Sequence, residues 1–530
     1  MTTQARPLDL QYRVALAVEY VVNNPDRNRD FRPYFSYQLL DAPVYMLHTF
    51  FDAPHVAGRF LDALLRAEAM TGMRADEEVE AGLTRQLFGC IGEDGLGYAE
   101  PGYTSPREAI IHDQRELLMG LTGLIVRRQS AQALQAAAKL VRRLWELTGE
   151  QGDETGNVPG PALRGDGWAP PSAMEGFRYA PANTGRLATA LNQYYLASHD
   201  PLALSLSRRF LNYSLRRCFH PDGALKEWAG FHLHSITGTV ESLVEFGMLV
   251  NESSYIEAGK RILDTGLRPF YSSWGWVKEN LANEANDGEA NNTGDVMRTA
   301  LLLGRAGYPE YYETAERMLR NHLLASQLLD VDWIVGREDP THPDEYDRTY
   351  RDIARRARGG FGFTCPNDWV TDQKRKAKRF PLNADIVQGS VQAIVAAWEH
   401  AVVQEPAGAK VNLYLTRATD SLAVTSCLPA EGRLVLEARQ DGNVLVRLPS
   451  WLKGDAVTVM VNQEPQPARV DGIYLCIDRL RAGDQVTLEF PLARRKVEEI
   501  VNYRLYRGEW TGDQLTALSP PGELRPLYTS

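Results

Sequence analysis

Cysteine is scarce in this chain of 530 residues. Its five cysteines are widely separated, and no two of them form a Cys-x-x-Cys pair; they are Cys90, Cys218, Cys365, Cys427 and Cys476. An odd, scattered set argues against a disulfide framework and against a zinc finger. We therefore expect reduced thiols in a cytoplasmic protein.

Long apolar runs and an excess of positive charge are also absent. The N-terminal stretch MTTQARPLDLQYRV has no apolar segment of the signal-peptide kind, and no run approaches the ~18 apolar residues that span a bilayer. The formal net charge of −10 disfavours nucleic acids and anionic membranes as partners, because such surfaces repel an acidic protein. A soluble protein is predicted.

Positive charge is concentrated in two runs, RTYRDIARRARGG at 348–360 and QKRKAKRF at 373–380. Such runs are usually solvated faces of the protein. The alternative is a basic rim that attracts an acidic sugar.

From about residue 9 to residue 401, apolar residues recur at helical spacing between links rich in Gly, Pro, Asn and Asp. Three segments, 189–215, 241–267 and 295–324, each predict a helix, a tight link and a second helix. Similar helical runs lie near 9–24, 36–51, 56–71, 76–89, 113–128, 131–147, 183–198, 201–217, 235–249, 254–267, 293–305, 309–326 and 384–401. About six helical hairpins favour a closed (α/α)6 toroid over residues 1–404.

The pattern changes after residue 404. Segments such as RLVLEAR and QVTLEFPL alternate apolar and polar residues, with turn residues at intervals of about ten. This pattern predicts an antiparallel β-sandwich over 405–500. The closing segment 501–530 is expected to pack back on the body of the protein.

The loop YSSWGWVKENLANEANDGEANNTGD, at 271–295, is the strongest candidate for a functional site. It combines carboxylates with indoles: Glu279, Glu284, Asp287, Glu289 and Asp295 beside Trp274 and Trp276. A sugar site needs such a set, because the sugar ring stacks on an apolar face while acids move protons. The alternative is a solvated loop, with Asn292 as a helix N-cap and Asp295 as its capping partner.

Other polar residues at predicted helix starts and in a second aromatic loop are weaker candidates. His232 and His234 stand two apart in FHLHSITGT, and without a third ligand they indicate a substrate hydrogen bond from His234 rather than a metal. Glu116 follows a polar helix start, where capping and solvation are equally good explanations. Cys365, in GGFGFTCPNDW, is more often a buried apolar residue than a nucleophile.

Several motifs in order resemble glycoside hydrolase family 127, the β-L-arabinofuranosidases and relatives of the (α/α)6-barrel group. The resemblance spans about residues 88–492 and is carried by EDGLGY, RELLMGLTGLI, HSITGTVESL, EANNTGDVMRTALLLGRAGYPEYYETAERMLRNHLLAS, FGFTCPNDW and VRLPSWLKG with VTVMVN. It implies a helical barrel, a sandwich and hydrolysis of a glycosidic bond.

The resemblance also implies roles for single residues. In that family a Glu-x-Cys and a later Cys-Cys hold a zinc ion, the first cysteine of the pair is the nucleophile, and an upstream glutamate is the acid/base. Glu289 matches the metal-binding glutamate, but Asn291 stands in place of its cysteine. Cys365 matches the second cysteine of the pair, and Thr364 stands in place of the nucleophile, with no base near it in the sequence.

Three further positions follow from the resemblance. Glu279 is the nearest counterpart of the acid/base glutamate, His234 matches a histidine that lines the pocket, and Arg115 stands where the family usually has histidine. Zinc normally takes four ligands, so Glu289 and Cys365 alone are too few for a tight site. No cofactor is expected; zinc is disfavoured but left open.

We therefore predict a glycoside hydrolase that acts on a small oligosaccharide or glycoside, arabinofuranoside-like or related, with Glu279 and Glu289 as catalytic carboxylates. The residues predicted to bind substrate are His234, His232, Trp276, Trp274, Cys365, Asn367, Trp369, Asn291 and Glu116. One alternative is a hydrolase or lyase for uronic-acid oligosaccharides, and another is a non-catalytic carbohydrate-binding relative. The expected partner is a carbohydrate, and a homodimer is left open.

Overall fold

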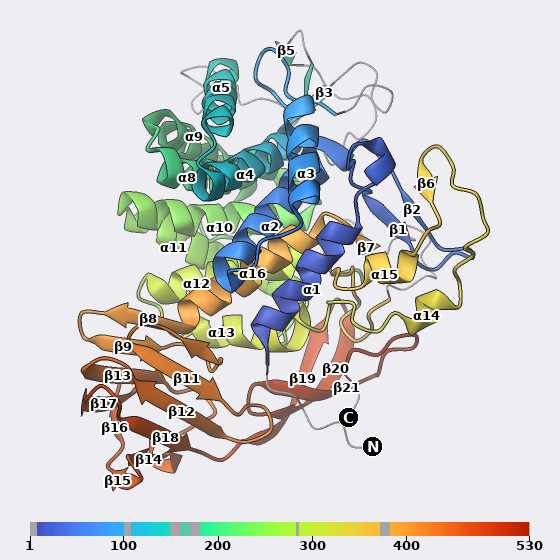
Figure 1. Cartoon of the computed structure of the whole chain (residues 1–530). Helices are drawn as coiled ribbons and strands as arrows, with labels where there is room; N and C mark the ends of the chain where they lie inside the picture. Colours follow the sequence, from blue (N-terminus) through green and yellow to red (C-terminus); the bar gives the residue numbers. More distant parts are fainter. Residues whose placement is uncertain are drawn as a thin grey trace.

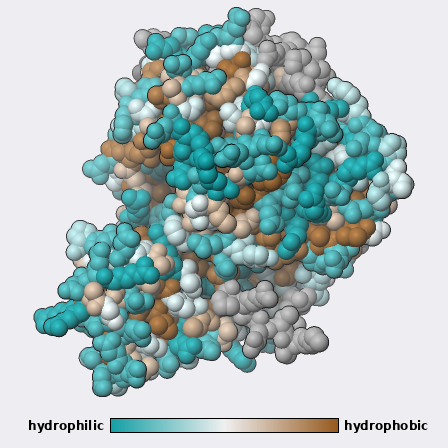
Figure 2. Space-filling view, in the orientation of Figure 1, coloured by the Kyte–Doolittle hydropathy of each residue, from teal (hydrophilic) through white to brown (hydrophobic). Residues whose placement is uncertain are grey.

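The computed structural model describes residues 8–99, 108–148, 162–164, 167–168, 181–281, 286–370 and 382–528. The chain forms a helical body, followed by β-sheets that lie beneath it in the view of Figure 1. The face in Figure 2 is mostly hydrophilic, with smaller apolar areas between the hydrophilic ones. No helix of the described part is long and apolar enough to cross a membrane.

The helical body is built from alternating outer and inner helices. In chain order they are α1 (Leu10–Asn23), α2 (Ala57–Thr71), α3 (Glu77–Gly89), α4 (Ile111–Arg128), α5 (Ala131–Thr148), α8 (Pro181–Ser198), α9 (Pro201–Cys218), α10 (Leu233–Val250), α11 (Ser253–Arg261), α12 (Ala290–Arg305), α13 (Tyr311–Met318) and α16 (Ile386–Ala401). The inner helices α2, α4, α8, α10, α12 and α16 each contact the next one, and α16 contacts α2. The ring of described helices is therefore closed, and the predicted (α/α)6 toroid is confirmed.

The outer and inner helices differ in how much of their surface is buried. On outer helix α5 the buried residues form one stripe, with Ala133, Ala137, Leu140, Val141 and Leu144 at helical spacing. On inner helices α10 and α12 nearly every residue is buried, polar ones included. Buried polar side chains need partners, so the inner helices must satisfy them at their contacts and at their ends.

Glycines allow two pairs of inner helices to touch backbone to backbone. A Cβ at Gly58 of α2 would lie 2.2 Å from the carbonyl oxygen of Glu116 on α4. On the other side of the ring, a Cβ at Gly294 of α12 would lie 2.8 Å from the carbonyl oxygen of Gly389 on α16. No side chain fits at these crossings.

The helix predicted at 36–51 is wrong. The segment forms strands β1 (Ser36–Gln38) and β2 (Tyr45–Leu47), which join β6 (Arg348–Thr349) and β7 (Leu382–Asn383) in the sheet order β6-β2-β1-β7. Pro43 explains the difference, because proline lacks the N–H of a helical residue and disfavours helical backbone at the residue before it. A second small sheet contains β3 (Glu108–Ile110), β4 (Ala162–Arg164) and β5 (Gly167–Trp168).

The β-sandwich is confirmed, with two sheets around a separate apolar core. One sheet has the order β10 (Arg417–Ala418), β11 (Leu422–Ser426), β12 (Arg433–Ala438), β18 (Gln485–Glu489), β14 (Thr458–Val461), β15 (Glu464–Gln466); the other has β16 (Arg469–Asp471), β17 (Tyr474–Leu480), β13 (Gly442–Arg447), β9 (Gly408–Val411), β8 (Val402–Glu405). The strands pair antiparallel except β9 and β13, which are parallel. Strand β12 alternates as predicted: Leu434, Leu436 and Ala438 are buried, and Glu437 is exposed.

A third sheet of β19 (Arg494–Val501), β20 (Arg504–Thr511) and β21 (Gln514–Ser519) packs against the toroid. Its buried face forms an apolar cluster with the indoles of the 271–295 loop; the cluster contains Trp274, Trp276, Val501, Tyr506, Trp510, Leu515, Leu518 and Tyr528. Beyond β21, the backbone of Arg525 and Leu527 hydrogen bonds with that of Trp369 and Asn367.

The crossing of α2 and α4 can be tested with Gly58→Ala. The added methyl group would overlap the Glu116 carbonyl, and we expect the free energy of unfolding to fall by about 1–3 kcal/mol. Gly89→Ala is the matched control, because nothing lies within 4 Å of its Cβ position at the end of α3. The control should be neutral or slightly stabilising in denaturant unfolding. Equal stability of the two variants would contradict the described crossing.

Candidate active site

The first turns of the inner helices meet at one end of the toroid. Because an outer helix returns the chain after each inner helix, all inner helices run in the same direction. Buried and half-buried polar residues are concentrated at this end, which we call the mouth. The buried ones are His55 and Arg59 near the start of α2, His112, Asp113, Arg115 and Glu116 of α4, Arg186 of α8, His234 of α10, and Glu289 and Asn291 at the start of α12; His232 before α10 and Asp385 before α16 are half-buried.

Glu116 lies at the centre of an ionic cluster in the mouth. Its carboxylate accepts hydrogen bonds from Arg59 at 3.0 Å, from Arg115 at 2.8 Å and from Arg186 at 3.2 Å. Burial by itself would raise the pKa of Glu116, but the three guanidinium groups outweigh it and hold the pKa well below its usual range. Glu116, a predicted substrate-binding residue, is thus bound on both oxygens by arginine.

The two predicted catalytic carboxylates lie on one hairpin. Lys278 and Gly288 face each other in an antiparallel bridge, with hydrogen bonds from Glu279 N to Asp287 O at 2.9 Å and from Glu289 N to Val277 O at 3.2 Å. Residues next to a bridge pair point to the opposite face, so Glu279 and Glu289 share a face of this hairpin. Both side chains are buried. Glu284 of the same loop lies outside the described residues.

The hairpin is held in place from three sides. Leu233 N at the start of α10 donates to Glu279 O at 3.1 Å, and Gly288 N donates to Thr364 O at 2.8 Å. The side chain of Asn502, in the turn between β19 and β20, accepts from Lys278 Nζ at 2.9 Å and donates to Asn286 at 2.7 Å. The C-terminal sheet therefore connects both strands of the hairpin.

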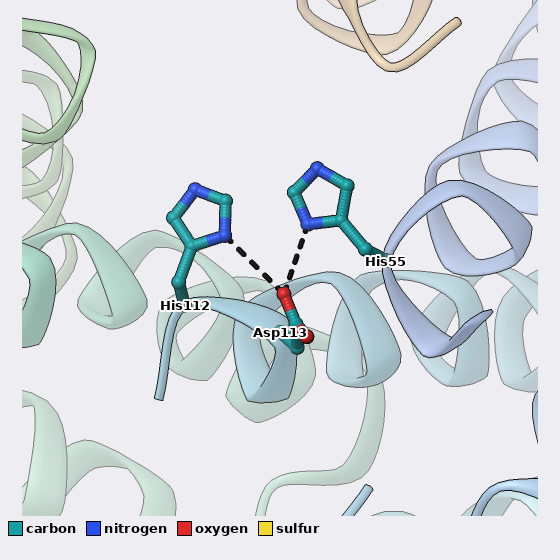
Figure 3. A group of neighbouring side chains, drawn as sticks. All are labelled: His55, His112 and Asp113. Atoms are coloured by element: carbon teal, nitrogen blue, oxygen red, sulfur yellow. Dashed lines mark hydrogen bonds and ion pairs between the residues drawn. The ribbon is translucent and has the colours of Figure 1, made fainter. Parts of the chain in front are cut away.

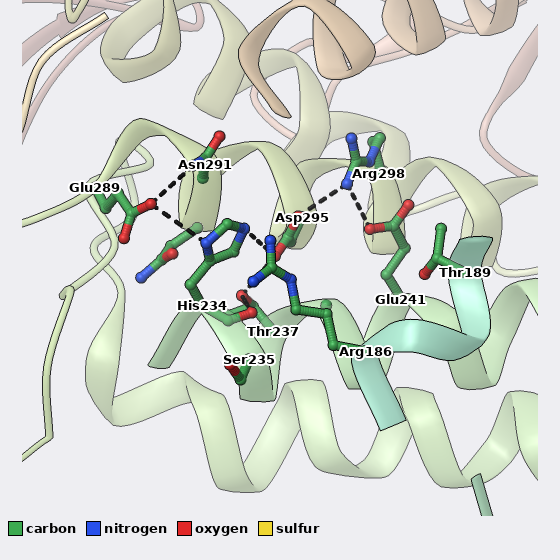
Figure 4. A network of polar contacts seen from close by, with 12 residues as sticks. Arg186, Thr189, His234, Ser235, Thr237, Glu241, Glu289, Asn291, Asp295 and Arg298 are labelled. Atoms are coloured by element: carbon green, nitrogen blue, oxygen red, sulfur yellow. Dashed lines mark hydrogen bonds and ion pairs between the residues drawn. The ribbon is translucent and has the colours of Figure 1, made fainter. Parts of the chain in front are cut away.

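Glu289 belongs to a polar network that runs along α12 (Figure 4). Asn291 Nδ2 donates to Glu289 Oε1 at 2.8 Å, and His234 Nδ1 lies 3.3 Å from the same oxygen. On its other side His234 Nε2 lies 3.4 Å from Asp295 Oδ2, and Asp295 accepts from Arg298 at 2.8 Å. Burial, and then Arg186 and Arg59, lower the pKa of His234 well below its usual value, whereas burial raises the pKa of Asp295 to about 6.

The capping role predicted for Asn292 and Asp295 is wrong. Helix α12 begins at Ala290, and its N-cap is Glu289. Asn292 Nδ2 instead donates to Lys278 O at 2.8 Å, and Asp295 is buried against Thr237 and Arg298. Polar residues followed by an apolar run resemble a solvated helix start, but here the helix start is buried against the 271–289 loop and against helices α10 and α16.

A second histidine–carboxylate group lies elsewhere in the mouth (Figure 3). His55 Nδ1 and His112 Nδ1 lie 3.1 Å and 3.4 Å from the same oxygen of Asp113, and the two rings stack with centroids 4.7 Å apart. His55 Nε2 lies 3.4 Å from Asp385. Burial and Arg59 oppose a charge on His55, but Asp113 and Asp385 outweigh them and raise its pKa.

Sequence reasoning missed His55, Arg59, Arg186 and Asp385. None of them stands in a motif or at a recurring spacing, and closure of the ring brings them together from positions up to 330 residues apart. The one signal was their position near predicted helix starts.

Thr364 does have a base beside it, contrary to its isolation in the sequence. Its Oγ1 lies 3.1 Å from His322 Nε2, and Ser326 Oγ lies 3.3 Å from the same nitrogen. All three side chains are buried, and burial lowers the pKa of His322 to about 3. The imidazole is therefore neutral, and its Nε2 is hydrogen-bonded to the Thr364 hydroxyl inside the core.

The remaining predicted binding residues make protein contacts. The indole N–H groups of Trp274 and Trp276 donate to Pro366 O at 3.1 Å and to Thr364 O at 2.8 Å. The indole of Trp369 donates to Ser326 O at 2.9 Å, and Asn367 Nδ2 donates to the carbonyls of Pro520 and Pro521, each at 3.0 Å. Cys365 is buried beside these residues.

The zinc–thiolate set implied by the family resemblance does not fit these residues. Asn291 presents its N–H, not a lone pair, to Glu289, and the hydroxyl of Thr364 is paired with His322. Cys365 would be the only thiolate of that set. We therefore assign no catalytic step to a zinc–thiolate centre.

Comparisons with known proteins identify the fold. A beta-arabinofuranosidase of glycoside hydrolase family 127 superposes with a TM-score of 0.61 at 15% identity, over 96% of this chain and 80% of that one. A family 127 beta-L-arabinofuranosidase from Geobacillus stearothermophilus T6 gives 0.60 at 14% identity, over 97% and 81%. A sugar epimerase from a ruminal bacterium gives 0.52 at 11% identity, over 73% and 97%. No sequence family and no curated protein matches the chain.

These similarities confirm the resemblance at the level of the fold. The chain is a distant structural relative of the family 127 enzymes, and it shares their toroid and sheet domain.

Glu116→Gln tests the ionic cluster of the mouth. The neutral amide would remove the one carboxylate that the three buried guanidinium groups share, so we expect the free energy of unfolding to fall by about 3–5 kcal/mol. Glu146→Gln, at a side chain 53% exposed, should change it by less than ~0.5 kcal/mol. Urea unfolding at neutral pH measures both, and a loss below 1 kcal/mol for Glu116→Gln would show that the cluster does not stabilise the fold.

His322 predicts a pH dependence of stability. Between its folded pKa of about 3 and its ordinary value of 6.5, the unfolded state binds a proton that the folded state does not. Stability therefore falls as the pH decreases through this window. The stability advantage of the wild type over His322→Gln should shrink by roughly 2–3 kcal/mol from pH 7 to pH 4.5. An advantage that stays constant in chemical unfolding would refute a buried, neutral His322.

Proposed function

We propose that the protein is a glycoside hydrolase that acts on a small oligosaccharide or glycoside, arabinofuranoside-like or related. The observation that carries the proposal is the pair of buried carboxylates, Glu279 and Glu289, on one face of a hairpin at the mouth of the toroid. Cleavage of a glycosidic bond by two carboxylic acids requires them on facing sides of one sugar.

The fold supports this proposal without deciding it. Two arabinofuranosidases share the architecture over nearly the whole chain, but an epimerase shares part of it as well. Function depends on the groups at the site, because one fold can carry several reactions. Two buried carboxylates on one face of the hairpin favour acid–base cleavage of an acetal.

The two carboxylates have different surroundings, which suggests different roles. Glu289 is fixed by Asn291 and lies against His234, so it is held in one orientation. Glu279, in the strand that follows Trp276, would give a proton to the leaving oxygen and later take one from water. Glu289 would be the second carboxylate that the cleavage needs, as the nucleophile or the general base.

The uronic-acid alternative has less support than the neutral-sugar reading. In the described part of the basic segment, Arg348, Arg351 and Arg355 pair with acidic neighbours, at 3.6 Å, 3.6 Å and 3.3 Å. Their charge is thereby compensated locally. The second basic run, 373–380, lies outside the described residues.

The proposal predicts that Glu279→Gln and Glu289→Gln each lower kcat/KM by about 10²–10⁴-fold, because each removes a group that moves or balances charge. The assay is release of the aryl group from a panel of aryl arabinofuranosides, galactosides and glucuronides. Glu437→Gln, on the exposed face of the sandwich, is the control and should keep full activity.

Two results would contradict the proposal. If both mouth variants hydrolyse as fast as the wild type, the carboxylate assignment is wrong. If calorimetry shows that the wild type binds sugars without hydrolysing any of them over long incubation, the protein is the non-catalytic relative.

A further inference from the structure

Strand β19 forms one edge of the C-terminal sheet beneath the toroid (Figure 1). It is eight residues long, RRKVEEIV at 494–501, and it pairs with β20 along its whole length. No other described helix or strand packs along it. A long edge strand presents N–H and C=O groups with which another strand can pair.

The turn between β19 and β20 shows which backbone groups point outward. Asn502 and Tyr503 both have positive φ, 47° and 66°, as in a type I′ turn. Val501 and Arg504 beside the turn therefore exchange hydrogen bonds, and such pairs alternate along the strand. In the described part of the chain, no other backbone bonds to the outward groups, which belong to Arg494, Lys496, Glu498 and Ile500.

The charges of β19 are separated by sign along the strand. The first three residues, 494–496, are basic, Val497 is in the middle, and Glu498 and Glu499 follow. The side chains of Lys496 and Glu498 are 84% and 62% exposed. Charges on an edge strand usually prevent pairing with other strands. This order of charges, however, is complementary to itself when read in the opposite direction.

A second copy of the strand fits the edge in one register. With Val497 opposite Val497 of an antiparallel second copy, Lys496 faces Glu498 and Arg495 faces Glu499, each twice by symmetry. Lys496 and Glu498 both present their backbone groups outward, so they can form a hydrogen-bonded pair. The two neighbouring symmetric registers would instead place Lys496 opposite Lys496 or Glu498 opposite Glu498.

The charges of β20 extend this complementarity. On the exposed face Lys496 Nζ lies 2.8 Å from Glu509, and Arg507 Nε lies 2.7 Å from Glu498. Across the joined sheets, each row of side chains would read Glu509, Lys496, then Glu498 and Arg507 of the second copy. The sign alternates at every step, and opposite charges on facing strands stabilise a sheet.

We propose that the outer edge of β19 is the contact of a symmetric homodimer, in which two copies pair antiparallel about Val497. The two three-stranded sheets then form one sheet of six strands. Through Asn502, this shared sheet would support the hairpin of Glu279 and Glu289 in both copies. The inference does not depend on the reaction that the protein catalyses.

The oligomeric state of the full chain tests the proposal. One pair of strands buries less area than a standard interface, so we expect a dimer with a dissociation constant of about 1–100 µM. Sedimentation at low salt should show a mass that rises with concentration from 59.3 kDa toward twice that value. Because the contact is ionic, ~0.5 M salt should shift the equilibrium toward the monomer. A monomer throughout that range at low salt would overturn the proposal.

Two charge reversals test the register. Lys496→Glu places two carboxylates opposite each other, and Glu498→Lys places two ammonium groups opposite each other, so each variant alone should dimerise at least tenfold more weakly. Mixed together, the two variants restore both opposite-charge pairs and should form a heterodimer. Glu437→Lys, on the exposed face of the sandwich, is the matched control and should dimerise as the wild type does. Circular dichroism and urea unfolding show whether each variant is folded.

A dimer that survives both reversals, or a mixture that stays monomeric although both variants are folded, would overturn this interface. Cross-linking gives a second measure of the register. In the proposed pair the two Val497 Cα atoms lie roughly 4.5 Å apart, within reach of a disulfide, so Val497→Cys should cross-link on mild oxidation. The two Ile500 positions would be roughly 20 Å apart. Ile500→Cys, at a side chain 72% exposed, should therefore not cross-link; equal cross-linking of both variants would contradict the register.

Discussion

The contact between Glu116 and three arginines sets the geometry on which the rest of the mouth depends. Arg59, Arg115 and Arg186 come from α2, α4 and α8, so one carboxylate connects three neighbouring inner helices. Buried charges are tolerated only when all partners are present, and this favours one register of the helices over others. Arg59 and Arg186 each use a second N–H group, on Asp385 O and on His112 respectively.

Much of the fold could be predicted because it follows from local patterns. Helical spacing on paired segments indicated the toroid, and alternation after residue 404 indicated the sandwich. The segment 36–51 shows the limit of this approach. Its apolar residues fit a helix, but β1 pairs with Asn383 and Leu382, more than 300 residues away, and no local pattern records such a partner.

The candidate site, like the fold, could be predicted only in part. Glu279, Glu289 and His234 were singled out from motifs, and the hairpin brings the first two onto one face. The indoles of Trp274 and Trp276 show that composition does not reveal direction: next to carboxylates they suggest a sugar platform, but the C-terminal sheet covers them. The two residues that differ from the family pattern also have hydrogen-bond partners within the protein: Asn291 binds Glu289, and Thr364 binds His322.

The support of the hairpin by the C-terminal sheet has a consequence for biosynthesis. Residues 277–289 leave the ribosome long before residues 502–506. Tyr506 packs with the indoles, and Asn502 connects the two hairpin strands. A nascent chain can close its ring of inner helices once α16 has emerged, but its two carboxylates still lack this outer support. The order of translation thus separates formation of the toroid from completion of the site.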